Sequence, residues 1–339
     1  MATTPNVSSF TLGQMTDLIE RSFNDSLKSL PQIMRNAPFV MEDTMSTGTG
    51  LFRRYAENVH RNQYARYRAE GDVAQQAAFQ YGYEKDLAVK TQSLSIGITK
   101  LMRVGGKNQE ILRMITDLSE SVPLSIDLDL SHRITFAYST SYVDRDGITV
   151  DVTTGDGLAL ASASHTLTWS ATTYSTIITS NPVFSKNALE TAEKSFVEGT
   201  FNNLGEKVAA SPEIILTTDD PATMNAVKEL LFATANTASS NSGTVNVYRN
   251  KYEHVVAPRI ATTANGGVDT NKSKYWALVC SELSDFYFTV LQEAQLQIPT
   301  KGNNGEDIAS GNWTYVADAI YGMCIVTARA WRFSNGSGS

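Results

Sequence analysis

The sequence is poor in the residues that build metal centres and many active sites. Its 339 residues include two cysteines and four histidines. The histidines stand in different predicted elements and form no HxxxH, HExxH or Cys/His pattern with metal-ligand spacing; they are His60, His132, His165 and His254. We expect no resident metal or other cofactor.

Both cysteines stand in apolar, strand-like runs, Trp276–Cys280 and Met323–Val326. A reduced, buried thiol behaves as a small hydrophobic side chain. Cys280 and Cys324 are therefore expected to be inert core residues.

Long apolar runs are also missing. No stretch of eighteen or more apolar residues is present, so the sequence predicts no membrane-spanning helix. Residues Met1–Asn6 lack the basic start and apolar stretch of a secretory signal. We expect a soluble protein of one elaborate unit or two coupled ones, made and kept in a cytoplasm.

Positive charge is in deficit, with 28 Lys and Arg against 35 Asp and Glu and a net charge of −7. Proteins that bind nucleic acid by neutralising phosphates need clustered Lys and Arg. The acidic balance argues against that mode for the chain as a whole.

What the chain does have is a segment, Leu51–Met102, crowded with aromatic and arginine residues. Two stretches rich in aromatic and β-branched residues flank the polar tip Glu70-Gly71-Asp72, which predicts a long β-hairpin. An isolated two-stranded hairpin is marginally stable in water, so we expect its partner on a neighbouring molecule. The candidate contact residues are Phe52, Arg53, Arg54, Tyr55, Tyr64, Arg66, Tyr67, Arg68, Phe79, Tyr81 and Tyr83, with Leu12 and Phe23 of a preceding helix.

Composition leaves three interpretations of this hairpin. Between Leu51 and Glu70 there are five arginines and two glutamates, which suits a surface for single-stranded nucleic acid. Arginine and aromatic residues are also enriched at the centres of protein interfaces. The acidic chain favours the protein interface, and a solvated arm without a partner is the third interpretation.

Apolar spacing predicts a helix over residues 12–27 and a second helix that begins near Asn108. Pro123 interrupts the second pattern, and residues 123–131 alternate apolar with polar residues as a strand would. We favour one long, kinked helix to about residue 138 and keep the strand as the alternative.

The remaining pattern predicts an α+β fold. Short β segments occupy 148–178, a helix covers 185–204, a strand and helix follow at 213–217 and 222–234, and a β-rich C-terminal third follows. Ser162, Ser164 and His165 lie together without a nucleophile-elbow sequence around them, and the acidic turn at 144–151 lacks EF-hand spacing. Nothing in the sequence is a convincing active site, so we expect a protein that is not an enzyme.

This order of elements resembles that of the major capsid proteins of tailed bacteriophages, with the HK-ninety-seven-like fold. Two runs resemble the Mu-like head subunits in particular: Leu130–Ala137, and Gly155–Leu167 with the pattern Asp-Gly-x-x-Leu-x-x-x-x-His-x-Leu. The resemblance implies an N-terminal arm over 1–50, an extended E-loop over 51–107, and a spine helix with part of the P-domain over 108–210. It further implies an A-domain over 211–300, and P-domain return strands with a flexible tail over 301–339.

The resemblance implies a structural subunit that self-assembles into hexamers and pentamers, forming an icosahedral shell around packaged double-stranded DNA without binding it specifically. The shell would be a virion capsid assembled in the host bacterial cytoplasm, with separate scaffold, portal and decoration proteins as further partners. Some relatives join subunits by a Lys–Asn bond from the E-loop, but residues 68–79 contain no Lys, so we expect a non-covalent shell. The alternatives are an encapsulin-like shell and, less favoured, an α/β enzyme using residues 211–300.

Overall fold

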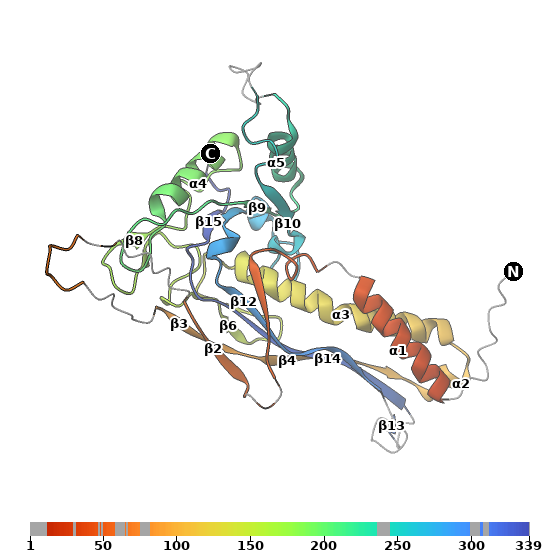
Figure 1. Ribbon diagram of the computed structural model, residues 1–339. Coiled ribbons are helices and arrows are strands. Elements are labelled where there is room, and N and C mark those ends of the chain that lie inside the picture. The colour runs from red at the N-terminus through yellow and green to blue at the C-terminus, as the bar shows by residue number, and fades with distance from the viewer. Residues whose placement is uncertain are drawn as a thin grey trace.

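The computed structural model describes residues 12–29, 32–46, 48, 50–57, 65, 67–74, 82–235, 245–298, 306–307 and 312–338. These residues form an α+β body with two main sheets, a long helix beside one sheet and a projecting arm (Figure 1).

The long helix is α3 (Asn108–Thr135), and α1 (Leu12–Ser29) packs along it (Figure 1). The short helix α2 (Lys100–Val104) precedes it. Helical spacing of three and four residues buries one stripe of α3; it comprises Ile111, Ile115, Leu118, Val122, Ile126, Leu130 and Ile134. The expected long helix is therefore confirmed.

Pro123 lies inside α3 and does not end it. A proline removes one backbone hydrogen bond from a helix interior. Hydroxyl groups on either side bond to nearby carbonyls: Ser121 Oγ donates to Leu118 O at 2.7 Å and Ser125 Oγ donates to Ser121 O at 2.9 Å. The strand alternative for residues 123–131 is wrong, because the helical stripe fills the core.

The larger sheet has the strand order β1 (Val40–Thr44), β12 (Phe286–Gln297), β14 (Asn312–Ile325), with β4 (Lys90–Ile98) and β13 (Glu306–Asp307) both paired to β14. β1 runs parallel to β12, and the other pairs are antiparallel. The predicted β-rich C-terminal third contains both long strands of this sheet, β12 and β14.

The smaller sheet has the order β10 (Glu253–Val256), β9 (Ile214–Thr217), β11 (Trp276–Val279), β15 (Trp331–Ser334). It lies with α4 (Lys186–Gly199) and α5 (Pro221–Phe232) in the upper part of Figure 1. Two short 3₁₀ helices, η3 (Pro258–Ile260) and η4 (Thr270–Lys272), lie between β10 and β11, and a third, η5 (Ser281–Leu283), lies between β11 and β12 of the larger sheet. Cys280 and Cys324 are free and buried, as predicted.

Arg332 on β15 caps the end of α4. Its side chain is fully buried, and Nη2 donates to Ser195 O at 3.3 Å and Gly199 O at 3.0 Å. The last carbonyls of a helix have no partner within the helix, so the guanidinium supplies the missing donors. Burial lowers the pKa of Arg332 to about 10.

The prediction of a flexible tail from Ser334 onward is wrong for the described residues. Ser334 belongs to buried β15, and Gly338 N donates to Asn181 O at 2.8 Å. Gly336 has a φ of +64° and fits tightly, because an added Cβ would lie 2.6 Å from Lys274 Cβ. At Gly336, the glycine allows a turn that packs closely against Lys274.

Two small hairpins complete the body: β5 (Ser141–Val143) with β6 (Thr149–Asp151), and β7 (His165–Thr166) with β8 (Thr173–Tyr174). In the described part of the chain, no helix has the length and apolar character needed to cross a bilayer.

Candidate functional site

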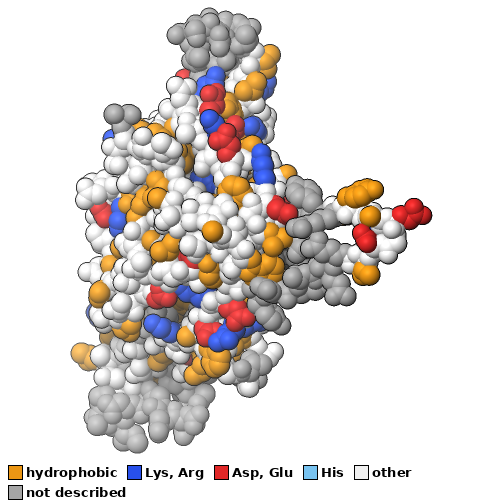
Figure 2. Space-filling view, turned by 90° about the vertical axis from the view of Figure 1, so that its left-hand side faces the viewer, with side chains coloured by type: hydrophobic (Ala, Val, Ile, Leu, Met, Phe, Trp, Pro, Cys, Tyr) orange, Lys and Arg blue, Asp and Glu red, His pale blue; other side chains and the backbone are white. Residues whose placement is uncertain are grey.

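A two-stranded hairpin carries the projecting segment. β2 (Phe52–Ala56) pairs antiparallel with β3 (Glu84–Ala88), with Phe52 opposite Ala88 and Ala56 opposite Glu84. We call the segment between these strands, residues 57–83, the arm. Its described outer part, residues 67–74, stands away from the body (Figure 1), and a projection with acidic and hydrophobic side chains is visible in Figure 2.

The outer arm exposes large side chains that a folded monomer normally covers. Tyr67 is 96% exposed and Val73 is 91% exposed, and Phe52 on β2 is 64% exposed. These exposures keep Tyr67 on the outer arm and Phe52 on β2 as candidate contact residues.

Half of the predicted hairpin has its partner within the same chain. β4 pairs along its whole length with β14, from Lys90 opposite Tyr321 to Ile98 opposite Trp313. The expectation that the entire Leu51–Met102 segment pairs with a neighbour is therefore corrected. Among the described residues, the exposed outer arm and the exposed positions of β2 and β3 stay candidates for such a contact.

Two predicted contact residues lie inside the protein. Phe23 is buried between α1 and the core. Tyr55 stacks on Tyr287 with ring centroids 4.1 Å apart, and its hydroxyl donates to Asp43 Oδ2 at 2.8 Å. Burial raises the pKa of Tyr55 to about 12. Tyr55 occupies an inward-facing position of its strand and Phe23 lies on the buried face of its helix, so both residues are removed from the proposed interface.

The two arginines of β2 are paired within the chain. Arg53 Nη1 lies 2.8 Å from Asp43 Oδ2, and Arg54 Nε lies 2.6 Å from Asp86 Oδ1. These contacts reduce the positive charge offered to phosphates and favour the protein-interface interpretation. Tyr64, Arg66, Phe79, Tyr81 and the side chain of Leu12 lie outside the described residues; Arg68 is exposed on the arm.

The base of the arm is a buried polar cluster that the sequence did not predict. Glu57 Oε2 accepts from Tyr83 N at 3.0 Å and from Asn203 Nδ2 at 3.2 Å. Arg329 Nη2 lies 2.5 Å from Glu57 Oε1, and the two form an ion pair without a hydrogen bond. Arg329 Nη2 also donates a hydrogen bond to Asn203 Oδ1. The Glu57 and Arg329 side chains are 0% and 5% exposed. We call these four residues the root cluster.

The Asp-Gly-x-x-Leu-x-x-x-x-His-x-Leu segment lies beside the root cluster. His165 Nδ1 donates to Asp156 Oδ2 at 2.7 Å, and Nε2 lies 3.2 Å from Leu160 O. Burial acts to raise the pKa of Asp156, but hydrogen bonds from His165 and Thr154 hold it below its usual value. The spacing of the motif thus closes a loop with a buried Asp–His pair.

This loop also contacts the arm. Tyr83 Oη is 2.6 Å from Thr166 Oγ1. Gly155 N donates to Val326 O at 2.8 Å, and a Cβ at Gly155 would lie 2.8 Å from Tyr83 Cβ. The motif therefore lines the place where the returning end of the arm enters the body.

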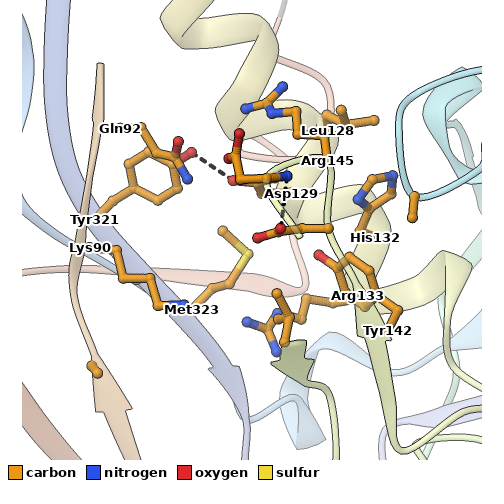
Figure 3. A pocket seen from close by; sticks show the side chains of 16 residues that line it. Lys90, Gln92, Leu128, Asp129, His132, Arg133, Tyr142, Arg145, Tyr321 and Met323 are labelled. Atoms are coloured by element: carbon orange, nitrogen blue, oxygen red, sulfur yellow. Dashed lines mark hydrogen bonds between the residues drawn. The ribbon is translucent and has the colours of Figure 1, made fainter. Parts of the chain in front are cut away.

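A separate small pocket lies between α3, β4, β14 and the β5–β6 turn (Figure 3). Tyr321 Oη donates to Asp129 Oδ2 at 2.8 Å, and burial raises the pKa of Asp129. Lys90, Arg133 and Arg145 line it together with acidic residues. Its volume of about 90 Å³ is far below the several hundred Å³ of most small-molecule sites, so it offers poor support for a substrate site.

The acidic turn near Asp144 bonds to itself. Asp144 Oδ1 accepts from Asp146 N at 3.0 Å and Ile148 N at 2.8 Å, as in an Asx turn. Among the described residues, no group of three or more His, Cys, Asp or Glu side chains is placed to hold a metal ion.

No protein-family model matches the sequence, and no curated protein matches it. Solved structures do match the fold. The capsid of Cyanophage P-SCSP1u aligns with a TM-score of 0.51 at 10% identity, over 89% of this chain and 87% of that one. Gordonia phage Cozz gives 0.51 at 10%, and the capsid of an empty GTA particle gives 0.51 at 8%, each over 90% of both chains. The chain therefore has the α+β fold of phage capsid proteins.

Proposed function

We propose that this chain is the structural subunit of an icosahedral phage head. It assembles through the arm into hexamers and pentamers, and the closed shell surrounds packaged double-stranded DNA. The observation that carries the proposal is the projecting arm with Tyr67 and Val73 exposed, on a body with the fold of phage capsid proteins.

The acidic composition supports a container more than a DNA-binding protein. A net charge of −7 gives the subunit little general attraction for phosphates, so packaged DNA stays free to enter and leave. Separate scaffold, portal and decoration proteins, assembly in a bacterial cytoplasm and kinship with the Mu-like subunits belong to this proposal.

The domain assignment follows the family plan. Residues 1–50 serve as the N-terminal arm, 51–107 as the E-loop and 108–210 as the spine helix with part of the P-domain. Residues 211–300, which contain α5 and most of the smaller sheet, serve as the A-domain, and 301–339 return to the P-domain.

The test removes the arm without disturbing the body. Glu57 N donates to Tyr83 O at 2.7 Å, so a short Gly/Ser turn can replace residues 58–81. The replacement leaves the root cluster and buried Tyr55 in place. We expect a folded subunit by circular dichroism that no longer forms shells in electron microscopy, because the arm supplies the contact between subunits.

Val143→Ser is the matched control, since Val143 is an exposed apolar residue on β5, outside the arm. It should form shells like the natural chain. Normal shells from the armless variant would contradict the role of the arm, and uniform monomers from the natural chain with its scaffold would contradict the proposed function. Protein cargo in place of DNA inside shells would identify an encapsulin-like container instead.

A further inference from the structure

Both ends of the arm meet at one buried carboxylate. Glu57 belongs to the outgoing end, and its Oε2 binds the backbone N–H of Tyr83 on the returning end. The same carboxylate contacts Asn203, which follows α4, and Arg329, which precedes β15. One side chain therefore ties the two ends of the arm to each other and to two distant parts of the body.

A buried ion pair is a poor way to gain net stability. Taking both charges out of water costs several kcal/mol per ion, and well-packed apolar residues of equal volume are often as stabilising. The hydrogen bonds that the Glu57 carboxylate accepts from Tyr83 N and Asn203 Nδ2 are directional, however, and they restrict how the groups that they join lie relative to one another. The root cluster thus suits the orientation of the arm better than it suits the stability of the fold.

The space around the cluster permits one arrangement of the arm ends. A Cβ on Gly82 would lie 2.3 Å from Glu57 Oε2, and a Cβ on Gly155 would lie 2.8 Å from Tyr83 Cβ. Real Cβ atoms do not approach other atoms so closely, so both positions require glycine for the arm ends to sit where they do. Such close contact between the glycines and the side chains of Glu57 and Tyr83 leaves little freedom to pivot.

We propose that the root cluster, with Gly82 and the Asp156–His165 loop, sets the direction in which the arm leaves the subunit. Glu57 and Arg329 are positioning residues: they hold the arm base so that the exposed outer arm points toward its binding place. The loop closed by Asp156 and His165 forms the wall against which Tyr83 rests. The consequence for shells rests on the proposed function, whereas the orientation itself is a property of the subunit.

Spin-label distances test the proposal in the full chain. Nitroxides on Tyr67→Cys in the arm and Val197→Cys on α4 report the arm direction, and both sites are exposed. Cys280 and Cys324 are buried and escape labelling. Labelled chains are diluted with unlabelled chains, so that only distances within one subunit are measured.

In Glu57→Gln/Arg329→Gln both charges disappear; the new side chain at 57 keeps the shape of glutamate, and the one at 329 is a shorter, neutral side chain that can still form hydrogen bonds. We expect the distance distribution to become at least about twofold broader as the arm base gains freedom to pivot. Gly82→Ala should also broaden the distance distribution, because the added Cβ pushes Glu57 aside. If the double variant fails to fold, this second variant still tests whether the root cluster sets the arm direction. Circular dichroism should show the natural helix and strand content in any variant that is scored.

Arg54→Gln/Asp86→Asn is the matched control, because it removes an exposed ion pair from the same hairpin. Its distribution should equal that of the natural chain. Equal widths for the natural chain and both root variants would overturn the proposal. Shell formation is scored separately: if the natural chain forms no shells, the proposed function fails while the distances still decide the positioning role.

Discussion

His132 is a buried histidine with cationic neighbours. Its side chain is 2% exposed, and burial together with the nearby Lys272 lowers its pKa to about 4. An unfolded chain protonates histidine near pH 6.5. Between pH 6.5 and about 4 the unfolded state therefore binds more protons than the folded state, and the free energy of unfolding falls as the pH falls.

Replacing His132 by Phe should remove part of this pH dependence. Phe keeps the edge contacts with the Phe136 and Tyr142 rings and takes up no proton. Urea unfolding at pH 7 and pH 4.5 should show a loss of stability on acidification that is smaller by on the order of 2 kcal/mol than in the natural chain. Some dependence should remain, since burial also lowers the pKa of His254 to about 4. The same loss of unfolding free energy between pH 7 and pH 4.5 in both proteins would contradict this account of His132.

For single residues, the sequence reveals local motifs more readily than contacts between residues that are far apart in the chain. The spacing of Asp156 and His165 was visible as a motif, because both residues lie in one short loop. The pairing of Glu57 with Arg329 was not, since the two residues are far apart in the chain and only the folded body brings them together. The burial of Tyr55 was missed for a similar reason: its neighbour Tyr287 comes from β12.

Helix α4 shows which features of an element are locally encoded. Ser185 begins it, and its Oγ accepts from Ala188 N at 3.2 Å, as an N-cap does. The predicted end, residue 204, is too late: the helix ends at Gly199, where Arg332 Nη2 donates to Gly199 O and to Thr200 Oγ1. The start of the helix thus depends on nearby residues, and its end depends on a distant strand.

Ser185→Ala should lower the free energy of unfolding by about 1 kcal/mol, because a helix N–H loses its acceptor. Chemical denaturation at neutral pH measures the change. Ser185→Asp, which retains an acceptor, is the control and should stay within about 0.5 kcal/mol of the natural chain. An equal loss in both variants would show that the serine acts through packing instead of capping.

The strand β4 was predicted in its place but with the wrong partner. Residues 90–98 have the composition of a strand, yet composition carries no information about which edge receives it. The longer strand β14 receives all nine residues of β4 in one continuous register. The part of the predicted hairpin proposed to contact another molecule is therefore smaller, and β4 does not belong to it.

At the scale of the whole molecule, subunits in a shell should be separable without breaking covalent bonds. The outer arm between Arg68 and Phe79 contains no lysine that could form an amide link to a neighbour. Assembled material boiled in detergent should therefore run as one band near 37.0 kDa. A ladder of multiples in the same gel would reveal a link formed by another residue.

The α+β class and the order of the main helices could be predicted because α1, α3, α4 and α5 carry strong local patterns. The composition of the sheets could not. β1 pairs with β12, and β11 pairs with both β9 and β15, so each sheet joins distant parts of the chain. Such pairings are decided by the shape of the assembled core.

The pairing of Glu57 with Arg329 can form only late in translation, because Arg329 is near the C-terminal end of the sequence. At about 5 to 20 residues per second, the arm leaves the ribosome tens of seconds before Arg329 is added. Until then Glu57 at the base of the arm lacks its ion-pair partner Arg329, and β15 has not yet paired with β11 in the smaller sheet. If the root cluster directs the arm as proposed, a nascent chain gains a defined arm direction only when translation is almost finished.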